Sequence, residues 1–361
     1  MTDLPRRTGT AHLPLHGGKA PAWLFSRMTK LAREITIAIV SDFGPQEMLY
    51  RLSDPYWFQA FGCVLGFDWH SSGVTTTVCG AVKEGIRGME PDLGFFVAGG
   101  KGGTSRKTPA EIEKAGHLIK ADTAKLIYAS RMSAKVDNNA LQDGYQLYHH
   151  VFCFTKEGDW AVIQQGMNEE NRYARRYHWL GEQVSDFVCE PHTAICAEAV
   201  AGTLNLVAKE SGEARETISD IARQENPDKI MGQLKKLQNL ELPRRHAIIM
   251  QDIHPDRLYK IFVQTYERQP ENFEKLLGME GVGAKTLRSL SLIAEIIYGA
   301  LVSFCDPARF SFAHGGKDGI PYPVDRKTYD KSIEILHNAL EKARIEDREK
   351  ISAVRRLRLW L

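Results

Sequence analysis

The 361-residue chain has no apolar run near the roughly 20 residues that a membrane-spanning helix needs. Its N-terminus, Met-Thr-Asp-Leu-Pro-Arg-Arg, lacks the apolar segment of a secretory signal. Its six cysteines are scattered and include no Cys-x-x-Cys pair, which argues against a zinc ribbon, an iron–sulfur cluster and a disulfide scaffold. These absences predict a soluble, cytoplasmic protein that does not enter a membrane.

A strong net charge is also missing. The total is +2; from Leu242 onward there are 20 Lys and Arg against 16 Asp and Glu, or +4, which leaves −2 for the rest. A mildly basic C-terminal part is compatible with a nucleic-acid contact but does not require one. The glycine-rich segment 99–103 lacks the pattern of a nucleotide phosphate loop, so we expect no nucleotide hydrolysis and interpret it as a mobile loop that closes on a polyanion.

The periodicity of apolar residues predicts two parts. Before about residue 200, a helix-rich stretch that opens at Pro21 precedes a short strand at 92–98 and a β-hairpin. After it, apolar residues recur at spacings of three and four, which is typical of helices. We therefore predict an α+β or α/β domain over residues 1–200, expected to hold any catalytic site, and an all-α DNA-binding domain over 201–361.

The most specific motif lies at residues 271–298. A short amphipathic helix, a Gly-Met-Glu-Gly-Val-Gly connection ending at Gly283 and a second helix from Ala284 resemble the helix-hairpin-helix DNA-binding motif. In such a hairpin, glycines equivalent to Gly281 and Gly283 permit positive φ and let a phosphate approach the backbone.

The other residues of the hairpin fit the same chemistry. Val282 is expected to insert into the core, and Lys285 adds a cation where the first N–H groups of a helix favour negative charge. Such a contact positions DNA without reading its sequence. The alternative is a glycine-rich turn between two packed helices.

Two sets of residues are candidates for binding Mg²⁺ or Mn²⁺. Asp68 and His70 stand two apart in a glycine-bounded segment, so both can reach one metal ion. The alternative for this pair is a helix-capping loop with a surface histidine. Asp137 and Asp143 precede the predicted hairpin of strands 145–154 and 160–167. We take Asp68, His70 and Asp143 as the metal ligands.

A two-residue turn at Glu157-Gly158 would place His150 opposite Gln165, with Phe152, Phe154, Ala161 and Ile163 on the same face of the sheet. Carboxylates at a strand mouth beside a polar residue of the next strand resemble metal-dependent nucleases of the restriction-endonuclease type. This chain departs from their pattern, because Gln164-Gln-Gly166 stands where an Asp/Glu-x-Lys is expected. The alternative is a hydrogen-bonded structural network.

Two further stretches are weaker candidates. Residues 171–179 interleave cations and aromatics, which suits a surface that contacts phosphates and stacks on bases, or an ordinary amphipathic segment. Glu190 and His192 form another candidate pair of metal ligands.

Three phrases carry a family resemblance. They are the stretch 16–24 followed by Arg27-Met28, the stretch 66–73, and the stretch 314–324 with Arg326 and Tyr329-Asp330. With them the chain resembles the prokaryotic family catalogued as domain of unknown function 763. The resemblance implies common descent with a DNA-processing family, and it transfers no catalytic residue.

The first and third phrases both begin with His-Gly-Gly-Lys. We expect these two loops to lie close together, with Lys19 and Lys317 facing DNA phosphates. The alternative is two independent surface loops that share four residues by chance.

Three functions remain open at this point. The first is a metal-dependent nuclease acting on damaged or branched DNA, with Asp68, His70, Asp137, Asp143, His150 and Gln165 in its catalytic site. The second is a DNA glycosylase with lyase activity that uses Lys285 and, near the expected spacing, Asp306. The third is a non-enzymatic DNA-binding scaffold. All three predict DNA as the partner, and a homodimer is compatible with each.

Overall fold

The computed structural model describes residues 13–15, 20–67, 72–197, 202–242, 246, 253–308 and 326–360, with the side chains of 326–329 and 358–360 excepted. Among these residues no helix is long and apolar enough to cross a membrane. The first helices are α1 (Ala22–Phe43), α2 (Pro45–Ser53), α3 (Pro55–Leu65), α4 (Gly73–Gly85), α5 (Glu90–Leu93), α6 (Thr108–Ala115) and α7 (Thr123–Lys135). The later helices are α8 (Gly212–Gln224), α9 (Pro227–Gln238), α11 (Pro255–Arg268), α12 (Phe273–Gly278), α13 (Ala284–Tyr298), α14 (Arg326–Lys342) and α15 (Asp347–Trp360).

An antiparallel five-stranded sheet forms the centre of the molecule, in the order β1-β3-β4-β5-β6. Its strands are β1 (Phe95–Lys101), β3 (Gln146–Thr155), β4 (Trp160–Asn168), β5 (Tyr173–Leu180) and β6 (Ala194–Cys196). A second, two-stranded ladder joins β2 (Leu141–Gln142) to β7 (Leu204–Asn205). Because no parallel pair occurs among the described strands, the fold is of the α+β class and not the α/β class.

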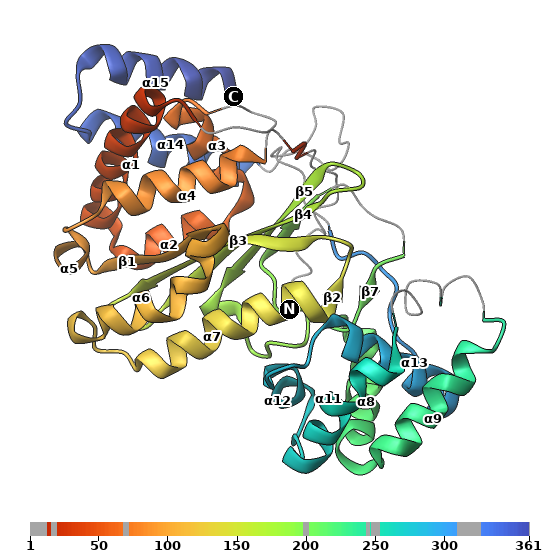
Figure 1. The fold of residues 1–361 in the computed structure, drawn as a ribbon. Coiled ribbons are helices and arrows are strands. Elements are labelled where there is room, and N and C mark those ends of the chain that lie inside the picture. The colour runs from red at the N-terminus through yellow and green to blue at the C-terminus, as the bar shows by residue number, and fades with distance from the viewer. Residues whose placement is uncertain are drawn as a thin grey trace.

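Helices cover both faces of the sheet (Figure 1). One face packs on α1–α4 through residues such as Val151 and Ile163. The other face packs on α6 and α7 through Phe152 and Val162. Successive side chains of a strand point to opposite faces, so strands buried on both sides are apolar without alternation. This explains the continuous apolar run at 151–154 in β3.

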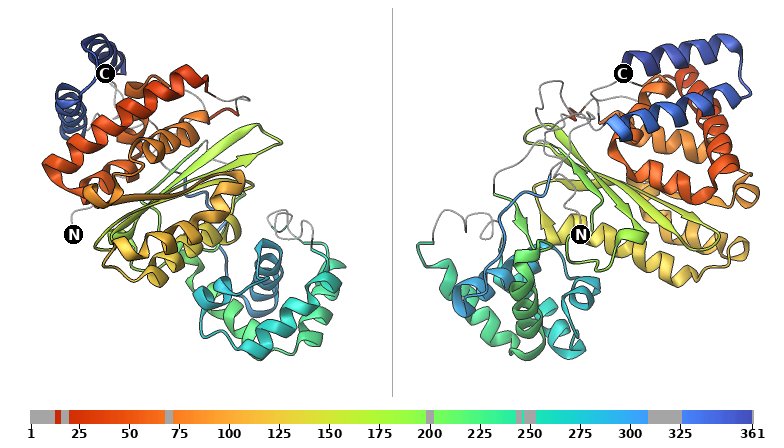
Figure 2. Two further views of the ribbon diagram at one scale, coloured as in Figure 1. Left: turned by 60° about the vertical axis from the view of Figure 1, so that its left-hand side comes forward. Right: turned by 180° about the vertical axis from the view of Figure 1, so that it is seen from behind.

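Helices α8 to α13 form a separate cluster on the α7 side of the sheet (Figures 1 and 2). Its contacts with the rest run mainly from α12 and α13 to α7 and to η3, the π-helical turn Val136–Ala140 that follows α7. Helices α8 to α13 therefore form a packed unit that includes the proposed hairpin.

The last two helices return to the first part of the chain. Helix α14 packs along α1, and α15 packs on α3. Leu336, Leu340 and Leu357 are buried in the same core as those N-terminal helices. The architecture thus differs from a division at residue 200, because the amphipathic helices near the C-terminus bury their apolar faces on α1 and α3 and not on the α8–α13 cluster.

The glycine-rich segment 99–103 is not a mobile loop. Gly99 to Lys101 belong to β1, and a 3₁₀ helix (η1, Gly102–Lys107) continues from it. At this sheet edge Gly99 donates its N–H to Glu111, and Lys83 donates to the Gly99 carbonyl. The two side chains therefore satisfy backbone groups that an edge strand leaves open.

Candidate nucleic-acid interface and buried polar network

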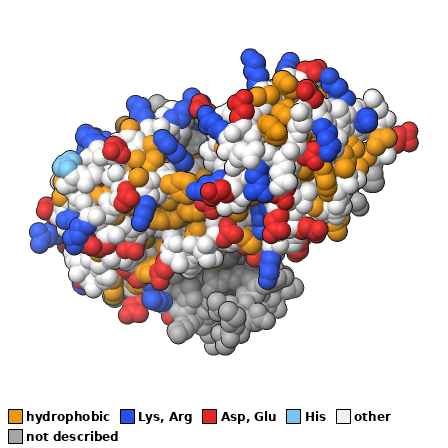
Figure 3. All heavy atoms as spheres, turned by 90° about the horizontal axis from the view of Figure 1, so that it is seen from below, with side chains coloured by type: hydrophobic (Ala, Val, Ile, Leu, Met, Phe, Trp, Pro, Cys, Tyr) orange, Lys and Arg blue, Asp and Glu red, His pale blue; other side chains and the backbone are white. Residues whose placement is uncertain are grey.

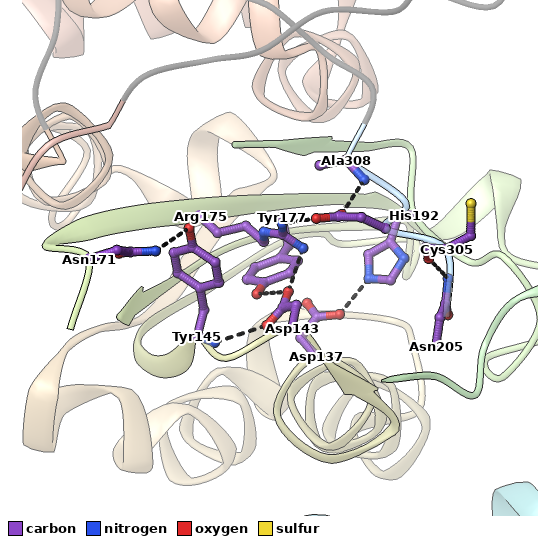
Figure 4. A network of polar contacts seen from close by, with 11 residues as sticks. Asp137, Asp143, Tyr145, Asn171, Arg175, Tyr177, His192, Asn205, Cys305 and Ala308 are labelled. Carbon is purple, nitrogen blue, oxygen red and sulfur yellow. Dashed lines mark hydrogen bonds and ion pairs between the residues drawn. The ribbon is translucent and has the colours of Figure 1, made fainter. Parts of the chain in front are cut away.

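A buried polar network connects η3 and the β2–β3 junction to strand β5 (Figure 4). The Asp143 carboxylate accepts hydrogen bonds from Arg175 Nη1 at 2.8 Å, from the Tyr177 hydroxyl at 2.7 Å and from the Tyr145 N–H at 3.0 Å. Arg175 Nη2 also donates to Asp306 at 2.6 Å. One fully buried arginine thus bridges two carboxylates contributed by distant segments.

The charges of this triad depend on one another. Burial raises the pKa of Asp143, and the Arg175 guanidinium opposes that rise. Burial lowers the pKa of Arg175, but Asp143, Tyr177 and Asp306 together outweigh it, so the pKa of Arg175 ends above its ordinary value. A charged Arg175 is the group that balances both carboxylates, and a metal ion at Asp143 would have to compete with it.

Asp137 lies next to Asp143 and is also completely buried (Figure 4). Its carboxylate contacts His192 Nε2 at 2.5 Å, Gln164 Nε2 at 2.5 Å and Trp179 Nε1 at 3.0 Å. Burial raises the pKa of Asp137, and His192 counteracts this rise. Three donors therefore fix the carboxylate, which in turn orients the largely buried ring of His192.

The hydrogen bonds continue from Asp137 across the sheet. The Gln164 carbonyl oxygen contacts His150 Nδ1 at 2.9 Å, and His150 Nε2 contacts the Ser130 hydroxyl of α7 at 2.9 Å. Burial lowers the pKa of His150 to about 4, so its ring is neutral near pH 7. The chain of contacts from His192 to Ser130 resembles a structural hydrogen-bond network more than an open metal site.

The predicted pairing of His150 with Gln165 is wrong. His150 pairs with Gln164, and Gln165 points to the opposite face as the partner of His149. The cause is the length of the turn: Thr155 pairs with Asp159 across a three-residue loop, in which Gly158 has φ +103°. Three-residue hairpin loops commonly place a residue in this left-handed region.

The same one-residue shift overturns the predicted face of the sheet. Phe152 and Phe154 share their face with Val162 and Trp160, so Ala161 and Ile163 lie on the other side. The cationic and aromatic residues at 171–179 are also not a surface: Arg175, Arg176 and Trp179 are fully buried. A strand buried on both faces explains the second correction.

No group of three or more potential metal ligands occurs in the described parts of the chain. Asp143 faces hydrogen-bond donors, and His192 contacts a single carboxylate, Asp137. The predicted metal ligands Asp68 and His70, and the predicted phosphate contacts Lys19 and Lys317, lie outside the described residues.

The proposed DNA-binding hairpin is well defined. Gly281 is exposed with φ +84°, and Val282 is buried, as the sequence predicts. Gly283 caps the start of α13 in an extended conformation, with φ −133°, that any residue can adopt. Positive φ is therefore needed at Gly281 alone. Lys285 is exposed in the first turn of α13.

Two side chains, one from α7 and one from β2, hold the hairpin in place. Lys135 Nζ donates to the Leu277 and Met279 carbonyls at 2.7 and 2.5 Å, and Gln142 Nε2 donates to the Ala284 carbonyl at 3.0 Å. Burial lowers the pKa of Lys135, and Glu280 opposes this effect. The segment that supplies Asp137 and Asp143 to the buried network thus also supplies an anchor of the hairpin.

Sequence reasoning missed several members of the network. Arg175, Tyr177 and Trp179 were read as parts of a surface, and Ser130 was not singled out. Their signal is the pair of carboxylates at 137 and 143, because buried carboxylates need donors that only a paired strand can supply.

Comparison with known proteins gives one match. The family described as a protein of unknown function (DUF763) matches residues 9–324. No curated protein and no solved structure matches the chain.

Proposed function

Because the chain belongs to the DUF763 family of proteins of unknown function, we propose a function from its own residues: it binds the DNA backbone through the hairpin at residues 279–285. The observation that carries the proposal is the start of α13. An exposed Gly281, a buried Val282 and a capping Gly283 lead into a 15-residue helix whose first turn carries the exposed Lys285. Such a helix start favours a phosphate.

The charges at this helix start favour an anion as well. The first turn of α13 contains no acidic residue, and it contains the exposed Lys285. A lysine in a first turn is unfavourable for the helix dipole, so its presence is better explained by a bound anion than by helix stability. Glu280, the nearest acidic residue in the connection, interacts with Lys135.

Anchoring of the hairpin supports the same function. Lys135 and Gln142 hold the carbonyls on its inner side, so the outward N–H groups are fixed before DNA arrives. Preorganised groups bind more tightly because less ordering is needed on binding. On the face that Figure 3 shows, described cations and anions are interspersed. The described residues of that face form no broad basic surface, so the proposal rests on the local hairpin.

The two enzymatic hypotheses receive less support. Metal-dependent cleavage needs carboxylates open to a cation, whereas Asp137 and Asp143 are occupied by donors. A lyase reaction through Lys285 was paired with Asp306, whose carboxylate instead binds Arg175 and the Ala308 N–H. Incubation of labelled DNAs with and without Mg²⁺ or Mn²⁺ tests both, and borohydride trapping isolates a lyase.

The test of DNA binding compares Gly283→Asp with Gly283→Asn. A Cβ at Gly283 would meet only Asn139 Oδ1, at 3.9 Å, so both variants should fold. Asp and Asn cap helices equally well, which makes each variant as stable as the wild type or more stable by a few tenths of a kcal/mol. Only Asp repels a phosphate. We expect fluorescence anisotropy to show at least about tenfold weaker DNA binding for Asp than for Asn, or about 1.4 kcal/mol.

Lys285→Ala should act more mildly. It should lower the slope of log K against log salt concentration by about one, since one fewer counterion is released. Equal affinity of Gly283→Asp and Gly283→Asn for DNA would contradict the proposal. Sedimentation of the wild-type complex gives the number of chains per DNA and so tests whether the chain acts as a homodimer.

A further inference from the structure

A second row of polar side chains crosses the other face of the sheet, beneath α4. Strand register aligns Lys101 of β1, His149 of β3, Gln165 of β4 and Arg176 of β5 as successive cross-strand partners. These four polar residues lie on a face of the sheet that is otherwise apolar, as at Val151 and Ile163. The row is independent of the His150–Gln164 network, which lies on the opposite face.

A β-bulge shapes this row. The register shifts between Leu147 and His149, so that Tyr148 and His149 both lie beside Gln165. β-Bulges re-aim side chains and are common next to functional sites. The Gln165 amide donates to the Tyr148 hydroxyl oxygen and, at 2.8 Å, to the Ser72 carbonyl. Thr75, in the first turn of α4, donates to the Gln165 carbonyl oxygen. The start of α4 is therefore fixed directly over the row.

His149 is the unexplained member of the row. Its side chain is buried, with 1% of the residue exposed, and neither ring nitrogen has a hydrogen-bond partner. Burial, with smaller effects of His150, Lys101 and Arg176, lowers the pKa of His149 to about 3. An imidazole that is buried, neutral and without a partner between cations costs stability, so it calls for an explanation beyond folding.

The surroundings of His149 have the chemistry of an anion site. Lys101 is exposed at the end of the row, with its Nζ 5.7 Å from the centre of the Tyr148 ring. The first turn of α4, a helix of 13 residues, contains no acidic residue. No carboxylate is among the groups of the described chain that act on His149.

We propose that Lys101, His149 and the first turn of α4 bind a phosphate group. Lys101 supplies the charge, the neutral ring of His149 donates one N–H, and the helix start adds its dipole. This site is separate from the hairpin, which lies in another part of the chain and is approached from the α7 side. The phosphate is either part of DNA or part of a small phosphorylated molecule, since both present the same oxygens.

The experiment measures the midpoint of thermal unfolding during titration with inorganic phosphate, at ionic strength held constant with chloride. A ligand that binds only the folded state raises this midpoint. Two variants are compared with the wild type: His149→Phe, which removes both ring nitrogens, and Lys101→Gln. The second change is on an exposed residue and keeps the test valid if His149→Phe fails to fold. Lys125→Gln, on the exposed side of α7, is the matched control.

We expect the apparent Kd for phosphate to rise at least tenfold in Lys101→Gln and His149→Phe and to stay unchanged in Lys125→Gln. In the wild type, the ¹⁵N signals of the His149 ring should shift as phosphate is added. Titrations with a mononucleotide and with a DNA oligonucleotide identify the source of the phosphate. They are done in Gly283→Asp as well, so that binding at the hairpin is distinguished from binding here.

Two results would overturn the proposal. One is the absence of any response to inorganic phosphate, the mononucleotide and the oligonucleotide. The other is an equal response in the wild type, Lys101→Gln and His149→Phe, which would place the bound phosphate elsewhere. Neither result bears on DNA binding by the hairpin, because that is read from the difference between Gly283→Asp and Gly283→Asn.

Discussion

At the scale of single residues, two neighbouring histidines of β3 have opposite environments. His150 is hydrogen-bonded through both ring nitrogens, to Gln164 and Ser130, whereas His149 on the other face has no hydrogen-bond partner. The sequence shows a His-His pair and predicts that a strand sends the two side chains to opposite faces. It does not show which ring finds partners, because these come from α7 and β4, at separations of up to 20 residues.

The depressed pKa of His149 predicts a pH effect on stability. The folded protein keeps this ring neutral down to a pKa of about 3, whereas in the unfolded chain it protonates near pH 6.5. Between these values the unfolded chain binds more protons, so the free energy of unfolding decreases as the pH falls. One group contributes about 1.4 kcal/mol per pH unit.

Urea unfolding of wild type and His149→Phe between pH 6 and 4 isolates this group, because the other titrating residues are common to both. We expect the wild type to lose about 1.4 kcal/mol more per pH unit than the variant. At pH 7.5 the variant should be at least as stable, since it removes a buried polar group without a partner. Parallel pH profiles would show that His149 is protonated or solvated in the folded protein.

The sequence predicted the carboxylates of the buried network but not the donors that bind them. Asp137 and Asp143 were singled out as carboxylates at the mouth of a strand, and the structure buries both in polar contacts with β5. Their partners Arg175 and Tyr177 come from β5, two strands along in the sheet order from β3. Sequence patterns fix the periodicity of a strand but not which strand lies beside it, so these donors could not be assigned.

At the scale of elements, the β3–β4 hairpin shows what pattern reading can and cannot give. Alternation and turn residues predicted both strands within about one residue of their observed ends. The register was wrong by one, because the glycine at 158 serves a three-residue loop and not a two-residue turn. A one-residue slip sends every side chain to the opposite face, so a small error in the turn became a large error in the site.

Strand β1 gives a prediction about an element and its edge. Gly99 has φ +91°, and a Cβ there would lie 2.2 Å from the His150 carbonyl oxygen. Gly103, four residues later, has no atom within 4 Å of such a Cβ. Gly99→Ala should therefore lose on the order of 3 kcal/mol of unfolding free energy through backbone strain and displacement of β3. Gly103→Ala should be neutral or should gain up to about 1 kcal/mol.

Thermal and urea unfolding of the two alanine variants check this prediction. The comparison is well matched, because both changes add one methyl group to the same glycine-rich segment. Similar stabilities for Gly99→Ala and Gly103→Ala would mean that β1 can move away from β3 at low cost. That result would favour the prediction from the sequence, in which the segment 99–103 is a mobile loop that closes on a polyanion.

At the scale of the whole molecule, both ends of the described chain build the same layer. Helices α14 and α15 cover α1 and α3, and Arg356 donates to the Val64 carbonyl at the end of α3. The α8–α13 cluster is thus inserted in the chain between the N-terminal helices and strands and the C-terminal helices α14 and α15, which pack together. The sequence predicted a helical stretch at 326–344, where α14 lies. Periodicity does not show which surface an amphipathic helix will cover, so the sequence did not predict that α14 and α15 pack on α1 and α3.

The packing of α14 and α15 on the N-terminal helices predicts which helices lose stability when a leucine in either hydrophobic core is truncated. Leu336 of α14 and Leu287 of α13 are both completely buried, the first beside α1 and the second in the cluster that holds the hairpin. Replacement of a buried leucine by alanine costs about 2–5 kcal/mol.

Because local opening follows cooperative units, Leu336→Ala should increase amide hydrogen exchange in α1 and α3 and leave α8 and α13 near the wild-type rate. Leu287→Ala should do the reverse, and it should also weaken DNA binding by loosening the helix that presents Lys285. Hydrogen exchange measured peptide by peptide distinguishes this from a single cooperative unit, in which each variant would raise exchange in all four helices alike.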